Sequence, residues 1–360
     1  MAPLRIPFKA VFRHASAERR ESCSVWAKAR SNDGLVGCGE GCPRPYVTGE
    51  SIESVQAFLE AQQSPIKGAI ADLGSLRSWI TQHKAVIDAN PAAWCAIELA
   101  LLDLMGKQSD QSLEALLGLE ALTGPFQYSA VLGDADPMAF EKQYQQYRHY
   151  GFTDFKLKLS GDIQRDKQKI TAFRHNQNLR VRLDANNLWR DPHEVIDYIR
   201  ALDCPLFAIE EPLTPNQYDK LLYIAEGLDS KIILDESFLR CEQFHQLPNR
   251  PDRWIINVRV SKMGGLLRCL EIVKRARALG IKLIVGAHVG ETSLLTRAAL
   301  TVAHAARDIL LAQEGAFGTL LLEKDVCDPP LVFQRKGLLE PKDYFDRKVP
   351  GHGLSFRTDL

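Results

Sequence analysis

Two lysines one position apart stand in a short apolar segment, DFKLKLSG at residues 154–161. Side chains alternate between the two faces of a β-strand, so we expect Lys156 and Lys158 to point the same way. Two ammonium groups this close repel each other, and each favours the neutral form of its neighbour. Either water screens the pair on an open face, or negative groups from elsewhere in the chain lie beside it.

Charged residues follow the next apolar segments at nearly constant spacing. Asp184 lies 26 residues after Lys158, Glu210 another 26 residues on, Asp235 25 residues after that, and Arg259 24 residues later. One β-strand and one helix with short loops occupy about this length, and repeated βα units predict a parallel sheet. The carboxyl ends of such strands meet at one rim. We therefore expect these side chains to gather around a single site.

Three carboxylates on successive strands form the hard oxygen site that Mg²⁺ prefers. Mg²⁺ beside a lysine suits removal of a proton α to a carboxylate, because the metal charge stabilises the enolate. Lys158 is the candidate base, and Lys156 would help to keep it neutral or would polarise the carboxylate. The alternative, that each acid is an ordinary surface charge at a strand end, is disfavoured by the regular spacing.

Hydrophobic periodicity predicts the elements that position these residues. The expected strands are 155–160, 181–186, 207–211, 231–237, 254–261 and 282–288. The expected helices are 91–107, 165–176, 192–203 and 266–280. Residues 24–41 predict a hairpin around an Asn-Asp-Gly turn. Six or more βα units favour a TIM (β/α) barrel, an α/β fold of roughly 200 to 250 residues. An open doubly wound sheet is disfavoured, because no Gly-rich phosphate loop follows an early strand.

Composition excludes several classes of partner. The chain has 45 Lys plus Arg and 45 Asp plus Glu, so no global basic field attracts nucleic acid. No run of about 18 apolar residues predicts a membrane span, and the N-terminus does not read as a signal peptide. Only Cys38 and Cys42 of the eight cysteines are close in sequence. We expect free thiols and a reducing cytoplasm rather than a zinc or disulfide pair.

As a set, KLKLS, LDANNLW, IEEPL, ILDES and SKMGG resemble the enolase superfamily, in its muconate lactonising (muconate cycloisomerase) and mandelate racemase-like subgroup. The resemblance covers essentially the whole chain. It implies an α+β capping domain at 1–122, a modified TIM barrel at 123–325, and a segment at 326–360 that returns to the capping domain. It also implies a homo-oligomeric enzyme acting on a small carboxylate.

The resemblance assigns roles by position. It implies Mg²⁺ on Asp184, Glu210 and Asp235, with Lys158 as the base. Glu211 and Glu236 stand next to two of the ligands and resemble residues that support such ligands.

One departure from the subgroup concerns the reaction outcome. Members that racemise or epimerise amino-acid derivatives usually have a second lysine in an Asn-Ile-Lys stretch, and here the stretch is Asn257-Val258-Arg259. Arginine is a poor base, so Arg259 favours a one-base reaction, either elimination of water or cycloisomerisation. Arg259 could still stabilise an enolate or bind a carboxylate. Lys262 is expected in the loop before Gly264-Gly265, in a structural role.

Other outcomes stay open. A racemase or epimerase of an N-acyl amino acid, dipeptide or betaine is the alternative reaction, and a non-catalytic binding protein on this barrel is a further possibility. His288 and Glu291 are expected at the mouth of the barrel, and Arg44 and Tyr46 in a capping segment that closes over it and favours an anionic substrate. The remaining candidates for supporting the site or binding substrate are Asn186 and Asn257.

Overall fold

The computed structural model describes residues 1–14, 17–174, 179–204, 206–343 and 349–357. An antiparallel sheet near the N-terminus has the order β1-β4-β5, and a separate ribbon pairs β2 with β3. The predicted hairpin is confirmed by the antiparallel pairing of β4 with β5. The strands are β1 (Ala2–Leu4), β2 (Pro7–His14), β3 (Ala17–Glu21), β4 (Ser24–Arg30) and β5 (Val36–Gly41).

Helices beside this sheet include the predicted one at 91–107, which is observed as α4. They are α1 (Ile52–Ala69), α2 (Leu73–Gln82), α3 (Lys84–Ala89), α4 (Pro91–Gln108) and α5 (Leu113–Leu117). Among the described residues, none of the helices combines the length and apolar character needed to cross a membrane.

Strand β5 packs directly on the backbone of α4. Glycines alternate along this strand, and small residues recur at helical spacing on α4. A Cβ atom added to Gly39 would lie 2.0 Å from the carbonyl oxygen of Ala96, and one added to Gly41 would lie 2.0 Å from that of Ala92. Only glycine permits this approach. The close contact fixes β5, and with it the position of the residues that follow β5 at the barrel.

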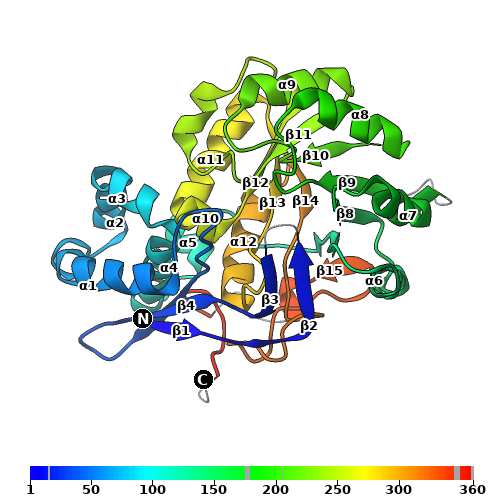
Figure 1. Cartoon of the computed structure of the whole chain (residues 1–360). Coiled ribbons are helices and arrows are strands. Elements are labelled where there is room, and N and C mark those ends of the chain that lie inside the picture. Colours follow the sequence, from blue (N-terminus) through cyan, green and yellow to red (C-terminus); the bar gives the residue numbers. More distant parts are fainter. Residues whose placement is uncertain (15–16, 175–178, 205, 344–348, 358–360) are drawn as a thin grey trace.

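Eight parallel strands in the order β14 to β7 form the second sheet, which curls into a barrel with helices outside (Figure 1). The predicted modified TIM barrel is therefore confirmed. The strands are β7 (Ala130–Leu132), β8 (Asp154–Lys158), β9 (Arg180–Asp184), β10 (Ala208–Glu210), β11 (Lys231–Leu234), β12 (Trp254–Val258), β13 (Lys282–Val285) and β14 (Leu310–Gln313). The helices are α6 (Pro137–Tyr150), α7 (Ile163–Arg174), α8 (Pro192–Leu202), α9 (Tyr218–Gly227), α11 (Leu266–Leu279) and α12 (Ser293–Ala305).

The βα repeat is broken between β11 and β12. Two 3₁₀ segments, η1 (Cys241–Gln246) and η2 (Pro251–Arg253), connect these strands within a fully described stretch. The expected strand at 254–261 is too long, because its last residues form the short helix α10 (Val260–Met263). Glycines with positive φ follow this helix and turn the chain into α11: Gly264 at 78° and Gly265 at 106°.

The remaining short elements lie near the chain segments that enter and leave the barrel. They are β6 (Phe126–Gln127), β15 (Leu338–Leu339), η3 (Arg335–Gly337) and η4 (Pro341–Asp343). Late residues contact the N-terminal helices: the Leu113 amide donates to the Gly351 carbonyl at 2.9 Å, and the His352 amide donates to Asp103 at 2.9 Å. The domain limits at residues 122 and 325 stay predictions.

Candidate active site

Small and branched apolar side chains form a separate buried cluster among the barrel strands. It consists of Ala208, Ile233, Ile255, Ile284 and Ala312. Four of these residues stand two positions before a polar residue, namely Glu210, Asp235, Asn257 and Glu314. Because strand side chains alternate, each polar residue points to the same face as its apolar predecessor. The apolar cluster is therefore the floor beneath the polar residues.

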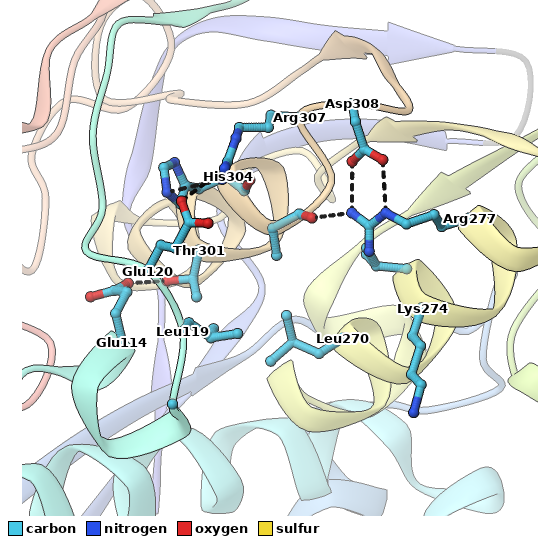
Figure 2. Close-up of a pocket in the computed structure, with 13 residues that line it drawn as sticks. Glu114, Leu119, Glu120, Leu270, Lys274, Arg277, Thr301, His304, Arg307 and Asp308 are labelled. Atoms are coloured by element: carbon cyan, nitrogen blue, oxygen red, sulfur yellow. Dashed lines mark hydrogen bonds and ion pairs between the residues drawn. The ribbon is translucent and has the colours of Figure 1, made fainter.

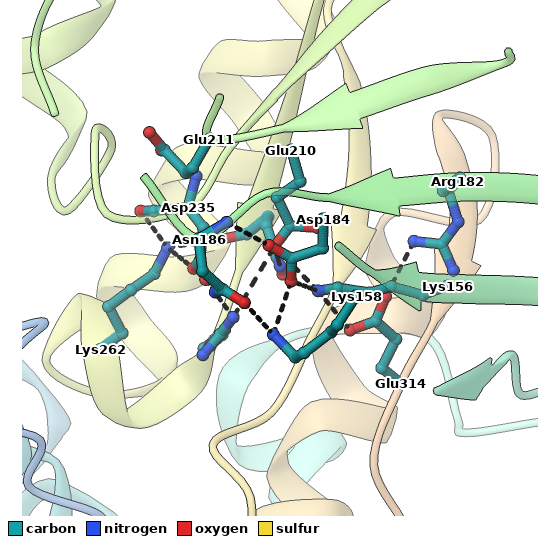
Figure 3. A network of polar contacts seen from close by, with 12 residues as sticks. Lys156, Lys158, Arg182, Asp184, Asn186, Glu210, Glu211, Asp235, Lys262 and Glu314 are labelled. Atoms are coloured by element: carbon teal, nitrogen blue, oxygen red, sulfur yellow. Dashed lines mark hydrogen bonds and ion pairs between the residues drawn. The ribbon is translucent and has the colours of Figure 1, made fainter. Parts of the chain in front are cut away.

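Both lysines of β8 converge on one oxygen of the acid that ends β9. Lys158 Nζ lies 2.8 Å from Asp184 Oδ2, and Lys156 Nζ lies 3.1 Å from the same atom (Figure 3). Lys158 also donates to Asn186 Oδ1 at 2.7 Å. The expectation that the two lysines point the same way is confirmed. Negative groups accompany the pair, which removes the alternative of an open, solvated face.

Lys156 is the more enclosed of the two lysines. Its ammonium group lies 2.8 Å from Glu210 and 3.2 Å from Glu314, and Glu314 is bound in turn by Arg182 at 2.8 Å. Burial alone would lower the pKa of Lys156, but Glu210, Glu314 and Asp184 more than offset it, and the net pKa is raised. Lys156 therefore stays charged.

Asp235 accepts hydrogen bonds from two positively charged side chains. Arg259 donates to its Oδ2, and Lys262 donates to its Oδ1 at 2.8 Å. Burial lowers the intrinsic pKa of Arg259, but Asp235, Glu210 and Glu236 raise it overall, so the guanidinium keeps its proton. Lys262 lies in α10, which corrects the expectation of a loop, because the two glycines follow the helix rather than replace it.

The acids next to the predicted ligands have different environments. Glu211 accepts hydrogen bonds from the Asp235 amide at 2.6 Å and from the Ser237 amide and hydroxyl, both at 2.8 Å, so it holds the loop that carries Asp235. Glu236 lines the pocket, and its buried Oε2 has no hydrogen-bond partner. Asn257 donates to Glu210 at 3.0 Å.

A narrow pocket opens above this network. Its apolar wall combines residues from the N-terminal part of the chain with residues of the barrel and of the loop after β14, and its polar wall contains the two lysines and Arg259. The lining residues are Phe12, Tyr46, Val131, Lys156, Lys158, Asn186, Glu236, Arg259, Ala287, Val289, Glu314 and Phe317. Tyr46 is one of these lining residues, and its role in binding substrate stays a prediction.

Three other expected residues do not reach the pocket. Arg44 is fully buried and donates to the carbonyl oxygens of Cys23, Pro43 and Val289, so its guanidinium serves main-chain atoms rather than a substrate. His288 and Glu291 are 1% and 2% exposed, and the residues on either side of His288 line the pocket instead. The prediction for His288 and Glu291 assumed that strand alternation continues to residue 288. Strand β13 ends at Val285, so alternation does not determine which way these two side chains point.

The donor set fits a hard divalent cation. Asp184, Glu210 and Asp235 are each 1% exposed, and the Oε2 atom of Glu210 has no hydrogen-bond partner. Burial raises the pKa of Glu210 to about 7 despite Lys156, and a further cation beside this carboxylate would offset the cost of burying its charge. The ammonium group of Lys156 lies between the first two acids, 3.1 Å from Asp184 and 2.8 Å from Glu210.

A wider hollow of about 610 Å³ lies outside the barrel, beside α11 and α12 (Figure 2). Two ion pairs lie among the residues that line it. Arg277 binds Asp308 through two hydrogen bonds of 2.7 Å, and Arg307 binds Glu120 at 2.8 Å. These pairs leave the pocket at the barrel mouth, with its unpartnered carboxylate oxygens, as the better candidate for catalysis.

A barrel with a lysine pair on its second strand and acids at the carboxyl ends of the third, fourth and fifth strands is typical of a class of enzymes that form enolates. The chain belongs to the enolase superfamily, in the mandelate racemase and muconate lactonizing enzyme group. Residues 3–118 match the family model described as the mandelate racemase / muconate lactonizing enzyme N-terminal domain. Residues 139–360 match the model described as enolase C-terminal domain-like.

Relatives with different reactions resemble the chain to similar degrees. N-succinyl-L-Arg/Lys racemase of Bacillus cereus is 26% identical over 330 residues, covering 90% of this chain and 87% of the relative. Muconate cycloisomerase 1 of Acinetobacter baylyi is 27% identical over 346 residues, covering 93% and 90%. The dipeptide epimerase of Enterococcus faecalis V583, solved with Mg and the dipeptide L-Leu-L-Tyr, superposes with a TM-score of 0.82 at 26% identity, covering 98% and 97%.

Proposed function

We propose that the chain removes the proton α to the carboxylate of a small amino-acid derivative, with Lys158 as the base, and that the product is the racemised or epimerised compound. The observation that carries this proposal is the position of Lys158, which lines the pocket and donates to Asp184 and Asn186. The racemase and epimerase relatives support the reaction and the class of substrate. They favour this reaction over the elimination or cycloisomerisation that Arg259 alone indicates.

Asp184, Glu210 and Asp235 would hold Mg²⁺ in this proposal. When bound, the metal supplies positive charge that stabilises the substrate carboxylate as it takes up negative charge. The magnesium in the solved Enterococcus faecalis relative supports this cofactor. Lys156 keeps its own proton, and therefore acts as a fixed cation between Asp184 and Glu210 rather than as a second base.

Arg259 supports a second candidate function. Its guanidinium is bound to Asp235, and its raised pKa makes it a poor proton donor and acceptor. A single base at Lys158 suits elimination of water or cycloisomerisation, and the muconate cycloisomerase relative fits that outcome.

The proposal is tested by offering both enantiomers of N-succinyl and other N-acyl amino acids, and then dipeptides, with Mg²⁺. Chiral chromatography reports racemisation, and proton NMR reports new vinylic, keto or lactone signals. Formation of the opposite enantiomer supports the first function. A broader panel of acid sugars and unsaturated diacids tests the second function. If these compounds give elimination products or lactones and no substrate is racemised, elimination or cycloisomerisation replaces racemisation as the proposed reaction.

The setting of the protein is part of the same proposal. We infer a homo-oligomer in the reducing cytoplasm that acts on small molecules rather than on nucleic acid or membranes. All eight cysteines are free thiols, which supports a reducing compartment. Size-exclusion chromatography with light scattering tests the oligomer, and a mass equal to one chain would contradict it.

A further inference from the structure

A second cluster of potential metal ligands lies behind the pocket wall. Cys42 follows β5, whereas His288 and Glu291 follow β13. One ligand atom from each of the three residues, the Cys42 sulfur, a His288 ring nitrogen and a Glu291 carboxylate oxygen, lie within 4.8 Å of one another. All three side chains are buried, at 0%, 1% and 2% exposure. The cluster therefore joins the N-terminal part of the chain to the barrel.

His288 is the unusual member of this cluster. Both of its ring nitrogens are buried and lack a partner at hydrogen-bond geometry, although the Cys42 backbone lies close enough to affect the pKa of the ring. Buried polar groups are nearly always paired, so two such atoms on one ring require an explanation. Burial and the nearby Arg259 and Arg44 lower the pKa of His288 far below its ordinary value. The ring is therefore neutral, which is the form that binds metals.

Glu291 is already oriented by the turn that contains both residues. The His288 amide donates to its Oε1 at 2.8 Å, and the same oxygen lies 3.9 Å from His288 Nδ1. Cys42 is held from the other side, because its amide donates to the Ser261 hydroxyl at 2.7 Å. The Cys42 backbone is thus fixed by a contact that leaves its sulfur free to bind, although the sulfur also accepts a hydrogen bond from the Ser24 hydroxyl at 3.4 Å. The carboxylate of Glu291 is oriented through one of its own oxygens.

We propose that Cys42, His288 and Glu291 bind a Zn²⁺ ion, or a similar borderline divalent metal, at a site distinct from the carboxylate site. Sulfur, imidazole nitrogen and carboxylate oxygen are the donors that zinc uses, whereas Mg²⁺ prefers oxygen alone. Binding displaces to solvent the proton of the Cys42 thiol and, where Glu291 carries one, its proton, and the resulting thiolate and carboxylate balance the two charges of the metal. Arg44, Arg259 and Lys262 oppose the metal until those charges form.

The bound metal would hold the pocket wall in place and would not take part in the reaction at the pocket. Ala287 and Val289, on either side of His288, line the pocket, and Arg44 already donates to the Val289 carbonyl at 2.6 Å. A metal on Cys42 and His288 would fasten this wall to the segment after β5. The proposal does not depend on the reaction that the pocket catalyses.

The test uses Co²⁺ as a spectroscopic probe of the full chain, after chelator treatment and in excess Mg²⁺ to saturate the oxygen site. We expect a thiolate-to-cobalt charge-transfer band that saturates at one equivalent and is displaced by Zn²⁺. Cys42→Ser and His288→Gln should lose the band. Cys38→Ser, the matched change of a buried thiol on β5, should retain it.

Two results would overturn the proposal. One is a wild-type cobalt spectrum without the thiolate band, and the other is a band that persists in Cys42→Ser. If the variants fail to fold, X-ray absorption of the zinc-loaded wild type decides instead. One sulfur at roughly 2.3 Å from zinc supports the site, and a shell of oxygen and nitrogen alone rules it out.

Discussion

Lys156 and Lys158 share a single oxygen of Asp184, at 3.1 and 2.8 Å. The two lysines nevertheless differ in their surroundings. Lys156 is also bound to Glu210 and Glu314, whereas the other partner of Lys158 is the neutral amide of Asn186. A lysine bound by three carboxylates cannot readily lose its proton, and this supports the proposal that Lys158, rather than Lys156, is the base.

Replacing Arg259 with Lys tests whether the arginine, which stands where related racemases have a second lysine base, disfavours racemisation relative to elimination. A lysine at this position can exchange a proton, which the guanidinium cannot do readily. We expect Arg259→Lys to retain the fold and to raise the ratio of racemisation to elimination at least tenfold. Chiral chromatography of the products measures this ratio. Arg259→Gln is the control, because it removes the charge without adding a base. Equal ratios in wild type and Arg259→Lys would contradict the role given to Arg259.

Mg²⁺ should stabilise the folded chain through the three acids. A ligand at 100 times its dissociation constant stabilises the native state by about 2.7 kcal/mol. We expect saturating Mg²⁺ to raise the midpoint of thermal unfolding in wild type and in Asp219→Asn, which changes an exposed acid on α9. Glu210→Gln should lose most of this rise. A metal response of the same size in Glu210→Gln would place the ion elsewhere.

The contact between β5 and α4 should not tolerate a methyl group. In Gly39→Ala the new Cβ would meet the carbonyl oxygen of Ala96 at 2.0 Å, and backbone cannot move aside cheaply. We expect a loss of about 3 kcal/mol in the free energy of unfolding, at the upper end for an overpacked core. Gly68→Ala in α1 is the matched control, because nothing lies within 4 Å of its added Cβ. Equal denaturant midpoints for the two variants would show that the predicted clash is absent.

Glu98 should make stability depend on pH. It accepts a hydrogen bond from the Leu267 amide at 3.0 Å, and burial raises its pKa to about 7. The folded state then binds the proton more tightly than the unfolded state, whose carboxyl titrates near 4.3. The stability that this proton contributes is complete below pH 4 and is lost as the pH rises to 7.

Glu98→Gln removes this titration and keeps the shape of the side chain. Relative to the variant, wild type should lose on the order of 3 kcal/mol between pH 5 and pH 8, measured by chemical denaturation. Glu60→Gln, an exposed change on α1, is the control. A difference between wild type and Glu98→Gln that does not change with pH would show that Glu98 is ionised in the folded state at pH 5.

The barrel and its charged rim could be predicted from sequence because they depend on local periodicity. Strands β10 to β13 are short, mainly apolar runs, whereas β8 and β9 alternate apolar with charged residues. The carboxyl ends of these parallel strands must share a rim. Spacing then placed Asp184, Glu210 and Asp235 together. Glu314 was missed, because the run before it, β14, was not identified as a strand. Continuing the count one βα unit beyond β13 would have found it.

Residues outside regular strands could not be placed in this way. His288 comes three residues after the end of β13, where alternation no longer determines direction. Arg44 has the sequence character of an anion-binding residue, but its partners are carbonyl oxygens from three distinct parts of the chain. These hydrogen-bond partners depend on how the N-terminal elements pack against the barrel. Local sequence patterns do not predict that packing.

The central claim is that Lys158 removes a proton α to a carboxylate. The most direct measurement is the loss of the α-proton NMR signal of an N-acyl amino acid or dipeptide in D₂O with Mg²⁺. We expect exchange with wild type and with Lys220→Ala, an exposed lysine change on α9, and a fall of at least 10³-fold with Lys158→Ala. Mg²⁺ binding, followed by calorimetry, should be retained in Lys158→Ala. Exchange that persists in that variant would contradict the account.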